Sequence, residues 1–223
     1  MTWKQTFTSS IGKKLVMGFT GLFLILFLVV HVTINSMIFL NDGGESFNTV
    51  AHFMSHNIIV RILEVGLFVG LILHIVQGLL LYYENGEKRG IAYAVPATGH
   101  TSKWYSRSMG LLGTLVLFFL IVHLANFWVP ARMDLYFRGD PPTDSFLDMK
   151  RVFSEWYIVV IYLAGVISLF WHLVQGFQSA FQTLGWRKGR YGSLFVAAGI
   201  GYSIIVCLLF ALMPILIYSK VIL

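Results

Sequence analysis

Charge is scarce in this sequence. The chain has 223 residues, of which 16 are Lys or Arg and only 10 are Asp or Glu. Charged residues make up 12% of the chain, about half the fraction that is usual in soluble domains. Hydrophobic residues make up 57%. These values argue against a soluble globular domain.

Cysteine is almost absent, since Cys207 is the single one. One cysteine excludes an intrachain disulfide framework, a Cys-based zinc or iron–sulfur site and the Cys-x-x-Cys-His pattern of covalently attached haem. Any cofactor must therefore be held by other ligands. The net charge of +6 is distributed by membrane side and does not form one basic surface, so nucleic acid is not an expected partner.

Five long stretches lack Asp, Glu, Lys and Arg altogether, and each is long enough to cross a hydrocarbon core of about 30 Å. They predict an all-α membrane protein with a single membrane-anchor domain over residues 1–223. Helices 1 to 4 are expected to form a four-helix bundle, with a fifth helix flanking it. The five transmembrane helices are expected at about 15–41, 58–83, 108–130, 156–184 and 191–219.

The positions of the basic residues predict the orientation. With the N-terminus in the cytoplasm, ten basic and two acidic residues lie inside (about +8), and six basic and eight acidic residues lie outside (about −2). The positive-inside rule supports this arrangement, which places the C-terminus outside. The ten inner basic residues are Lys4, Lys13, Lys14, Lys88, Arg89, Lys103, Arg107, Arg187, Lys188 and Arg190. In the second outer loop, Pro141-Pro142 marks a turn.

A repeat relates the first two helices to the next two. His74-Ile75-Val76-Gln77-Gly78 in helix 2 matches His172-Leu173-Val174-Gln175-Gly176 in helix 4. Val29-Val30-His31 in helix 1 matches Ile121-Val122-His123 in helix 3. The chain therefore contains two related helix pairs, followed by a fifth helix without histidine.

One histidine lies in each of helices 1 to 4. An ionisable side chain within a span is costly and normally faces the bundle interior or a partner. From a rise of about 1.5 Å per residue, His31 and His123 lie roughly 15 and 12 Å from the outer ends of their helices. His74 and His172 lie roughly 20 and 24 Å inward of the outer ends of theirs. The four histidines thus form an outer pair and an inner pair.

Each pair joins helices that are diagonal in a four-helix bundle, which leaves the width of a planar cofactor between the rings. Two facing imidazoles are the ligands of a bis-histidine haem. Small residues share the helix faces of His74 and His172 and are expected to leave room for a porphyrin: Gly66, Gly70 and Gly78, and Gly165, Ser168, Gly176 and Ala180. Zinc or copper is the competing metal. However, each histidine pair offers such an ion only two histidines and no carboxylate or thiolate. We expect two haem b groups, with His31, His74, His123 and His172 as axial iron ligands.

The chain resembles the single-chain, five-helix, dihaem cytochrome b subunits of bacterial succinate dehydrogenase and fumarate reductase, the b558 family. The resemblance lies in Ser9-Ser10-Ile11-Gly12-Lys13-Lys14, in Met17 and Thr20-Gly21-Leu22-Phe23-Leu24, and in His31, Asn35 and the two His-x-Val-Gln-Gly segments. It implies that His31 and His123 hold the outer, distal haem and that His74 and His172 hold the inner, proximal haem. It also implies a bacterial cytoplasmic membrane, a flavoprotein partner with covalent FAD, an iron–sulfur partner subunit and menaquinone as the quinone.

The sequence indicates the quinone site only weakly. Arg61 and Glu64 lie three residues apart at the outer end of helix 2 and suggest either an interfacial ion pair or a quinone site beside the outer haem. His52 and His56 in the adjoining loop are weaker candidates. His100, near the inner face, is a further candidate for contacting a haem propionate, and Ser9, Ser10 and Lys13 receive no assigned role.

Three functions remain open at this point. The first is the electron-transfer anchor of a succinate:menaquinone oxidoreductase, with the succinate or fumarate chemistry on a partner subunit. The second is the cytochrome b of another quinone-linked dehydrogenase, of the hydrogenase or formate dehydrogenase type, or a cytochrome b561. The third is a transporter that relays protons through its histidines, although the spans contain no carboxylate. The direction of the reaction, the coupling to membrane potential and the oligomeric state are not predicted.

Overall fold

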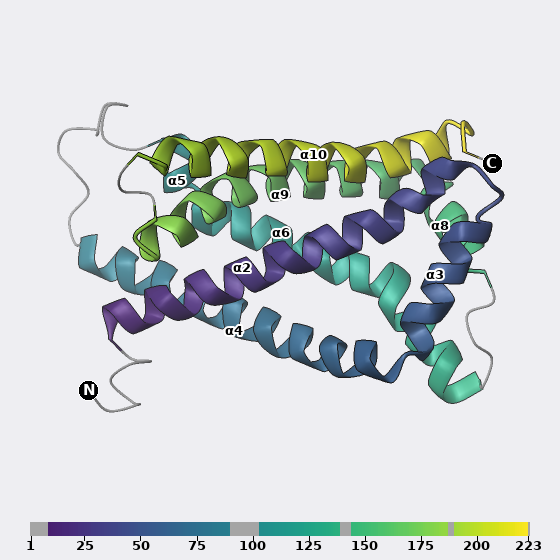
Figure 1. Ribbon diagram of the computed structural model, residues 1–223, viewed down its shortest axis with the longest axis horizontal. Helices are drawn as coiled ribbons and strands as arrows, with labels where there is room; N and C mark the ends of the chain where they lie inside the picture. Colours follow the sequence, from purple (N-terminus) through teal and green to yellow (C-terminus); the bar gives the residue numbers. More distant parts are fainter. Residues whose placement is uncertain (1–8, 90–102, 139–143, 187–189, 223) are drawn as a thin grey trace.

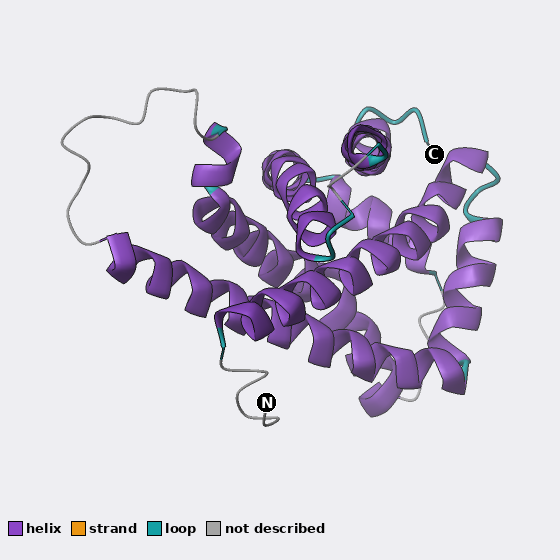
Figure 2. Cartoon of the chain, turned by 60° about the vertical axis from the view of Figure 1, so that its left-hand side comes forward, coloured by secondary structure: helices purple, strands orange, loops and turns teal. Residues whose placement is uncertain are grey.

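The computed structural model describes residues 9–89, 103–138, 144–186 and 190–222, and within these ranges every regular element is a helix (Figures 1 and 2). Five helical segments are long and apolar enough to cross a membrane, which confirms the predicted all-α fold. The turn predicted at Pro141-Pro142, His100, and the basic residues Lys4, Arg187 and Lys188 lie outside the described residues.

The five spans match the charge-free stretches closely. The first is α2 (Ser10–Asn35), which a short 3-10 turn, η1 (Ser36–Leu40), continues. The second is α4 (Ile58–Arg89), the fourth α9 (Trp156–Thr183) and the fifth α10 (Gly192–Tyr218). Their ends lie within a few residues of the predicted ones, except that α4 extends to Arg89.

The third span is less regular than the others. It consists of α6 (Met109–His123), the π-turn η2 (Leu124–Trp128), α7 (Val129–Met133) and a second π-turn, η3 (Asp134–Arg138). The predicted end at residue 130 is therefore too early. Pro130 does not stop the helix, because it occupies the first turn of α7, where a missing backbone N–H is tolerated.

Helices 1 to 4 form the expected bundle. The first span, α2, packs against both α4 and α9, and α6 packs against α9. This places α2 opposite α6 and α4 opposite α9, so the diagonal helices are 1 with 3 and 2 with 4. The fifth span, α10, runs along α9 and also contacts α2, which is the flanking position that was predicted (Figure 1).

Two outer segments that were predicted as loops contain short helices, α3 (Glu45–His56) and α8 (Ser145–Phe153). Both lie at the end of the bundle where the C-terminus is found (Figure 1), and we call this the outer end, following the predicted orientation. Each is amphipathic, with an apolar face that joins the core of the outer end and a polar face. The polar face of α8 carries Asp148, Lys150 and Arg151, whereas that of α3 carries mainly uncharged polar residues. The buried residues of the two apolar faces are Phe47, Phe146, Met149 and Phe153.

Asp144 and Asn48 join these two surface helices. The Asp144 side chain caps α8 by accepting a hydrogen bond from the Leu147 N–H (2.8 Å), and it also accepts one from Asn48 Nδ2 (2.9 Å). Asn48 Oδ1 in turn accepts the Phe146 N–H (3.0 Å). The hydrogen bond from Leu147 lowers the pKa of Asp144 below its ordinary value. Both helices are therefore anchored by the same polar contact over the outer end.

At the opposite, inner end, Lys13 on α2 and Glu84 on α4 form an ion pair. Ser9 caps α2 by accepting the Gly12 N–H at 3.0 Å. Ser9 and Lys13, to which the sequence assigned no role, thus fix the start of the first span.

Candidate functional site

The outer histidine pair lies between two diagonal helices. His31 on α2 and His123 at the end of α6 have ring centroids 5.8 Å apart, with an angle of 88° between the rings. Aromatic side chains surround the pair, and Phe27 stacks on His31 at 5.2 Å. Rings from α6, η2, α9 and α10 complete the enclosure: Phe119, Phe127, Tyr162 and Phe210. The pair therefore sits in an apolar setting.

The inner pair has nearly the same geometry. His74 on α4 and His172 on α9 have ring centroids 6.2 Å apart and an angle of 73° between the rings. Glycine backbone lies beside each ring: a Cβ on Gly21 would lie 3.5 Å from Cε1 of His74, and one on Gly113 would lie 3.5 Å from Cε1 of His172. The two rings are thus approached by the main chains of α2 and α6.

Both spacings fit an iron atom between the two imidazoles. Two metal–nitrogen bonds of about 2 Å each, with half a ring on either side, put the centroids roughly 6 Å apart. Nδ1 of His123 and Nδ1 of His172 are buried and have no hydrogen-bond partner among the described residues. Within the described ranges, no three His, Cys, Asp or Glu side chains converge on one point. Two protein ligands per site suit a metal whose other ligands come from a porphyrin, and ligation by these four histidines stays a prediction.

Four of the five glycines predicted to leave room for a flat ring have a side chain of a neighbouring helix within 4 Å of where a Cβ would lie. A Cβ on Gly165 would lie 2.3 Å from the ring of Phe119, which itself contacts His123. A Cβ on Gly70 would lie 3.0 Å from Phe23. Gly66 has open space around it. Close helix packing therefore explains much of this pattern.

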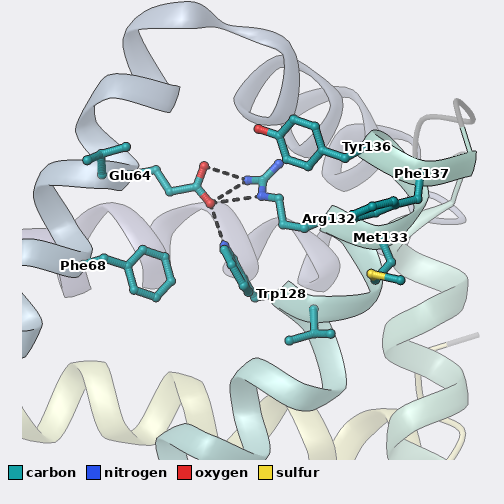
Figure 3. A pocket seen from close by; sticks show the side chains of 9 residues that line it. Glu64, Phe68, Trp128, Arg132, Met133, Tyr136 and Phe137 are labelled. Atoms are coloured by element: carbon teal, nitrogen blue, oxygen red, sulfur yellow. Dashed lines mark hydrogen bonds and ion pairs between the residues drawn. The ribbon is translucent and has the colours of Figure 1, made fainter.

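A pocket of about 410 Å³ opens at the outer end, between α4 and the second half of the third span (Figure 3). Its walls are mainly aromatic and aliphatic. The residues that line it are Glu64, Val65, Phe68, Trp128, Val129, Arg132, Met133, Tyr136 and Phe137.

Glu64 is the polar centre of this pocket. Its Oε1 accepts hydrogen bonds from Trp128 Nε1 (2.6 Å) and Arg132 Nε (3.0 Å), and its Oε2 accepts one from Arg132 Nη2 (3.0 Å). Both charged side chains are mostly buried, with 19% of Glu64 and 20% of Arg132 exposed. A carboxylate and a guanidinium thus meet at the wall of an apolar cavity.

The sequence suggested an ion pair between Arg61 and Glu64. This prediction is wrong, because Glu64 has a different partner. Glu64 pairs with Arg132, whereas Arg61 donates to the Tyr136 hydroxyl and to the Ser55 carbonyl. Arg132, Tyr136 and Trp128 were not singled out from the sequence. Arg132 could have been noticed from the sequence, because it is the first charged residue after the third charge-free stretch.

The two loop histidines do not join either pair. His52 and His56 lie in α3, stack on each other with centroids 4.0 Å apart and are exposed. The structure gives them no place in the pocket or beside the intramembrane histidines.

Comparison with known proteins finds one relevant similarity. The chain is 26% identical over 185 residues to the succinate dehydrogenase cytochrome b558 subunit of Bacillus subtilis (strain 168), an alignment that covers 79% of this chain and 84% of that protein. No family model matches the chain. No solved structure matches it either. The similarity supports the resemblance of this membrane protein to the succinate dehydrogenase cytochrome b558 subunits.

Proposed function

We propose that this chain is the dihaem cytochrome b anchor of a succinate:menaquinone oxidoreductase, which carries electrons between an iron–sulfur subunit and membrane quinone. The observation that carries the proposal is the presence of two diagonal histidine pairs, 5.8 and 6.2 Å between centroids, in a five-span bundle. The named relative supports the same family. When bound, haem b supplies a one-electron redox centre at each of the two depths.

The protein would bind the two haem groups, orient them and enclose them. His31 and His123 would hold the outer haem, and His74 and His172 the inner one. The rings around the outer pair exclude water, which keeps the local dielectric constant low and favours a defined reduction potential. Tyr162, one of these rings, also accepts a hydrogen bond from Asn126 (3.3 Å), which fixes its position beside His123.

We place the quinone in the pocket at Glu64. Its apolar walls suit a hydrophobic ring and tail, and its polar groups suit the two carbonyl oxygens. Glu64 can take up a proton from solvent and pass it to a reduced quinone oxygen, while Arg132 can hydrogen-bond to that oxygen. Trp128 follows His123 by five residues on the same span, so the pocket begins roughly 8 Å along the span from the outer pair.

In the orientation predicted from the basic residues, the inner end would face the cytoplasm of a bacterium, where the iron–sulfur subunit would dock and pass electrons to the inner haem. A flavoprotein bearing FAD would oxidise succinate or reduce fumarate on that side. Basic residues among the described inner ones, including Lys14, Lys103 and Arg107, offer a positive docking surface.

A reduced-minus-oxidised absorption spectrum of the purified chain tests the proposal. We expect a b-type α-band and, by pyridine haemochrome assay, two haems per chain. Copurification with a flavin-bearing subunit would separate this function from that of a hydrogenase or formate dehydrogenase cytochrome. The absence of an α-band would overturn the haem assignment, and two haems without a flavoprotein partner would overturn the assignment to succinate oxidation.

A further inference from the structure

Thr20 on α2 touches His74 of the inner pair. Its Oγ1 lies 3.2 Å from Nδ1 of His74. The same hydroxyl donates its proton to the Val16 carbonyl oxygen at 2.8 Å, one turn back along the helix. Because that proton is already used, the oxygen faces the imidazole as an acceptor, and the hydrogen bond requires a proton on Nδ1.

This contact determines which nitrogen of His74 is free. With the proton on Nδ1 and donated to Thr20, the lone pair lies on Nε2, the nitrogen that can bind a metal. The neighbouring Gly21 brings the α2 backbone against the same ring, so that its Cβ would lie 3.5 Å from Cε1. The ring is thus held at one edge by a hydroxyl and at another by main chain.

The repeat allows a direct comparison with the other ring of the pair. An offset of 92 residues relates His31 to His123 and also Gly21 to Gly113, while an offset of 98 relates His74 to His172. Gly113 lies against His172 as Gly21 lies against His74, at the same 3.5 Å. The backbone contact is therefore the same in both copies.

The hydroxyl is not repeated. The offset of 92 takes Thr20 to Leu112, which is buried and has no side-chain hydrogen-bonding group. Nδ1 of His172 accordingly has no hydrogen-bond partner among the residues that the structure describes. The two imidazoles of the inner pair thus have the same contact with a glycine backbone. They differ in that a hydroxyl oxygen lies beside Nδ1 of His74 and, in the described part of the chain, none lies beside Nδ1 of His172.

We propose that Thr20 is a positioning residue for His74: its hydroxyl accepts the Nδ1 proton, fixes the tautomer and plane of the ring, and makes the two axial ligands of the inner haem unequal. The inference rests on the proposed function, because it concerns the haem held by His74 and His172. A hydrogen-bond acceptor at Nδ1 makes the imidazole a stronger electron donor, which favours ferric iron and lowers the reduction potential.

The chain provides a matched control for this role. Thr114 on α6 donates to its own helix, to the Gly110 carbonyl at 2.9 Å, in the same way that Thr20 donates to Val16. No hydrogen bond joins Thr114 to a histidine among the described contacts. A change at Thr114 therefore removes an intramembrane hydroxyl of the same kind without touching the inner pair.

The test uses the intact complex and compares Thr20→Val, Thr20→Ser and Thr114→Val by redox titration and by the low-spin ferric EPR signals of the two haems. We expect Thr20→Val to raise the midpoint potential of the inner haem and shift its EPR signal, with the outer haem unchanged. Thr20→Ser, which keeps the hydroxyl, should behave as the wild type, and Thr114→Val should shift neither haem.

The outcomes separate this inference from the proposed function. Two haems with unchanged potentials and EPR signals in Thr20→Val would overturn the role of Thr20 and leave the haem assignment intact. An equal shift in Thr20→Ser and Thr20→Val would mean that the methyl group matters, and would also overturn it. If Thr20→Val loses the inner haem, retention of wild-type signals in Thr20→Ser still supports the hydroxyl. An inner haem that persists without His74 would overturn the proposed function itself.

Discussion

Glu64 and Arg132, which lie 68 residues apart in the chain, form a two-pronged ion pair that joins α4 to α7 at the wall of the outer pocket. The pair is mostly buried, so each partner depends on the other for its charge to be tolerated. The pair therefore joins the second and third spans at the wall of the pocket in which we propose that quinone binds.

Replacing Glu64 by Gln is expected to lower quinone turnover about 100-fold or more, because the pocket loses its proton donor. Haem content and spectra should remain those of the wild type. The measurement is quinone-dependent electron transfer in the purified complex, with spectra recorded on the same sample. Glu45→Gln, an exposed glutamate of α3 on the same side, is the control and should leave turnover unchanged. Normal turnover in Glu64→Gln would remove the quinone from this pocket.

Replacing His123 by Ala is expected to remove the outer haem and keep the inner one, because the two pairs share no ligand. The pyridine haemochrome assay should fall from two haems per chain to one. His172→Ala is the reciprocal variant and should remove the inner haem. A variant at His123 that retained the outer haem while losing the inner one would contradict the pairing.

Replacing Gly165 by Ala is expected to destabilise the bundle by about 1–3 kcal/mol, since the new Cβ would overlap the ring of Phe119. Gly66→Ala is the matched control, because nothing lies within 4 Å of the added methyl group. Thermal unfolding in detergent should show a lower midpoint for Gly165→Ala and an equal or higher one for Gly66→Ala. Equal loss in both variants would mean that the Phe119 contact is not responsible.

Lowering the pH is expected to loosen α8. The hydrogen bond from Leu147 lowers the pKa of Asp144 in the folded protein, so the ionised form stabilises the helix cap. That stability is present above the unfolded pKa of about 3.9 and is lost as the pH falls through the lower folded value. Amide hydrogen exchange over residues 145–153, corrected for intrinsic rates, should accelerate below about pH 4.

Two substitutions at this position separate capping from titration. Asp144→Asn keeps a capping acceptor but does not titrate, so the acid-dependent loosening of α8 should disappear. Asp144→Ala should cost about 1 kcal/mol at neutral pH. If the Asn variant loosened at the same pH as the wild type, another group would be responsible.

The sequence alone predicted the five spans well, because apolar length and absence of charge are what a bilayer requires. It missed α3 and α8, which lie along the outer end and do not span the bilayer. The uncharged stretch 46–60, which covers most of α3, is polar and too short to span a membrane, and α8 carries Asp148, Lys150 and Arg151. It ended the third span at about residue 130, because the charge-free stretch stops before Arg132, whereas the helix continues through charged residues to Arg138.

The candidate site was predictable to different extents. The four histidines stood out because each is a polar residue within an apolar run and recurs in the repeat. The partner of Glu64 could not be predicted, since reasoning along one helix considers neighbours three or four residues away and Arg132 lies on another span. Thr20 looked like an ordinary helical threonine until its distance to His74 was known.

The diagonal arrangement of the histidines also has a consequence for biogenesis. The outer pair becomes available once the third span has entered the membrane, whereas His172 emerges from the ribosome 49 residues after His123. A nascent chain arrested between the third and fourth spans therefore contains both proposed outer ligands and only one of the two proposed inner ligands. Cofactor insertion into this protein is expected to be sequential, with the outer position filled before the inner one can be completed.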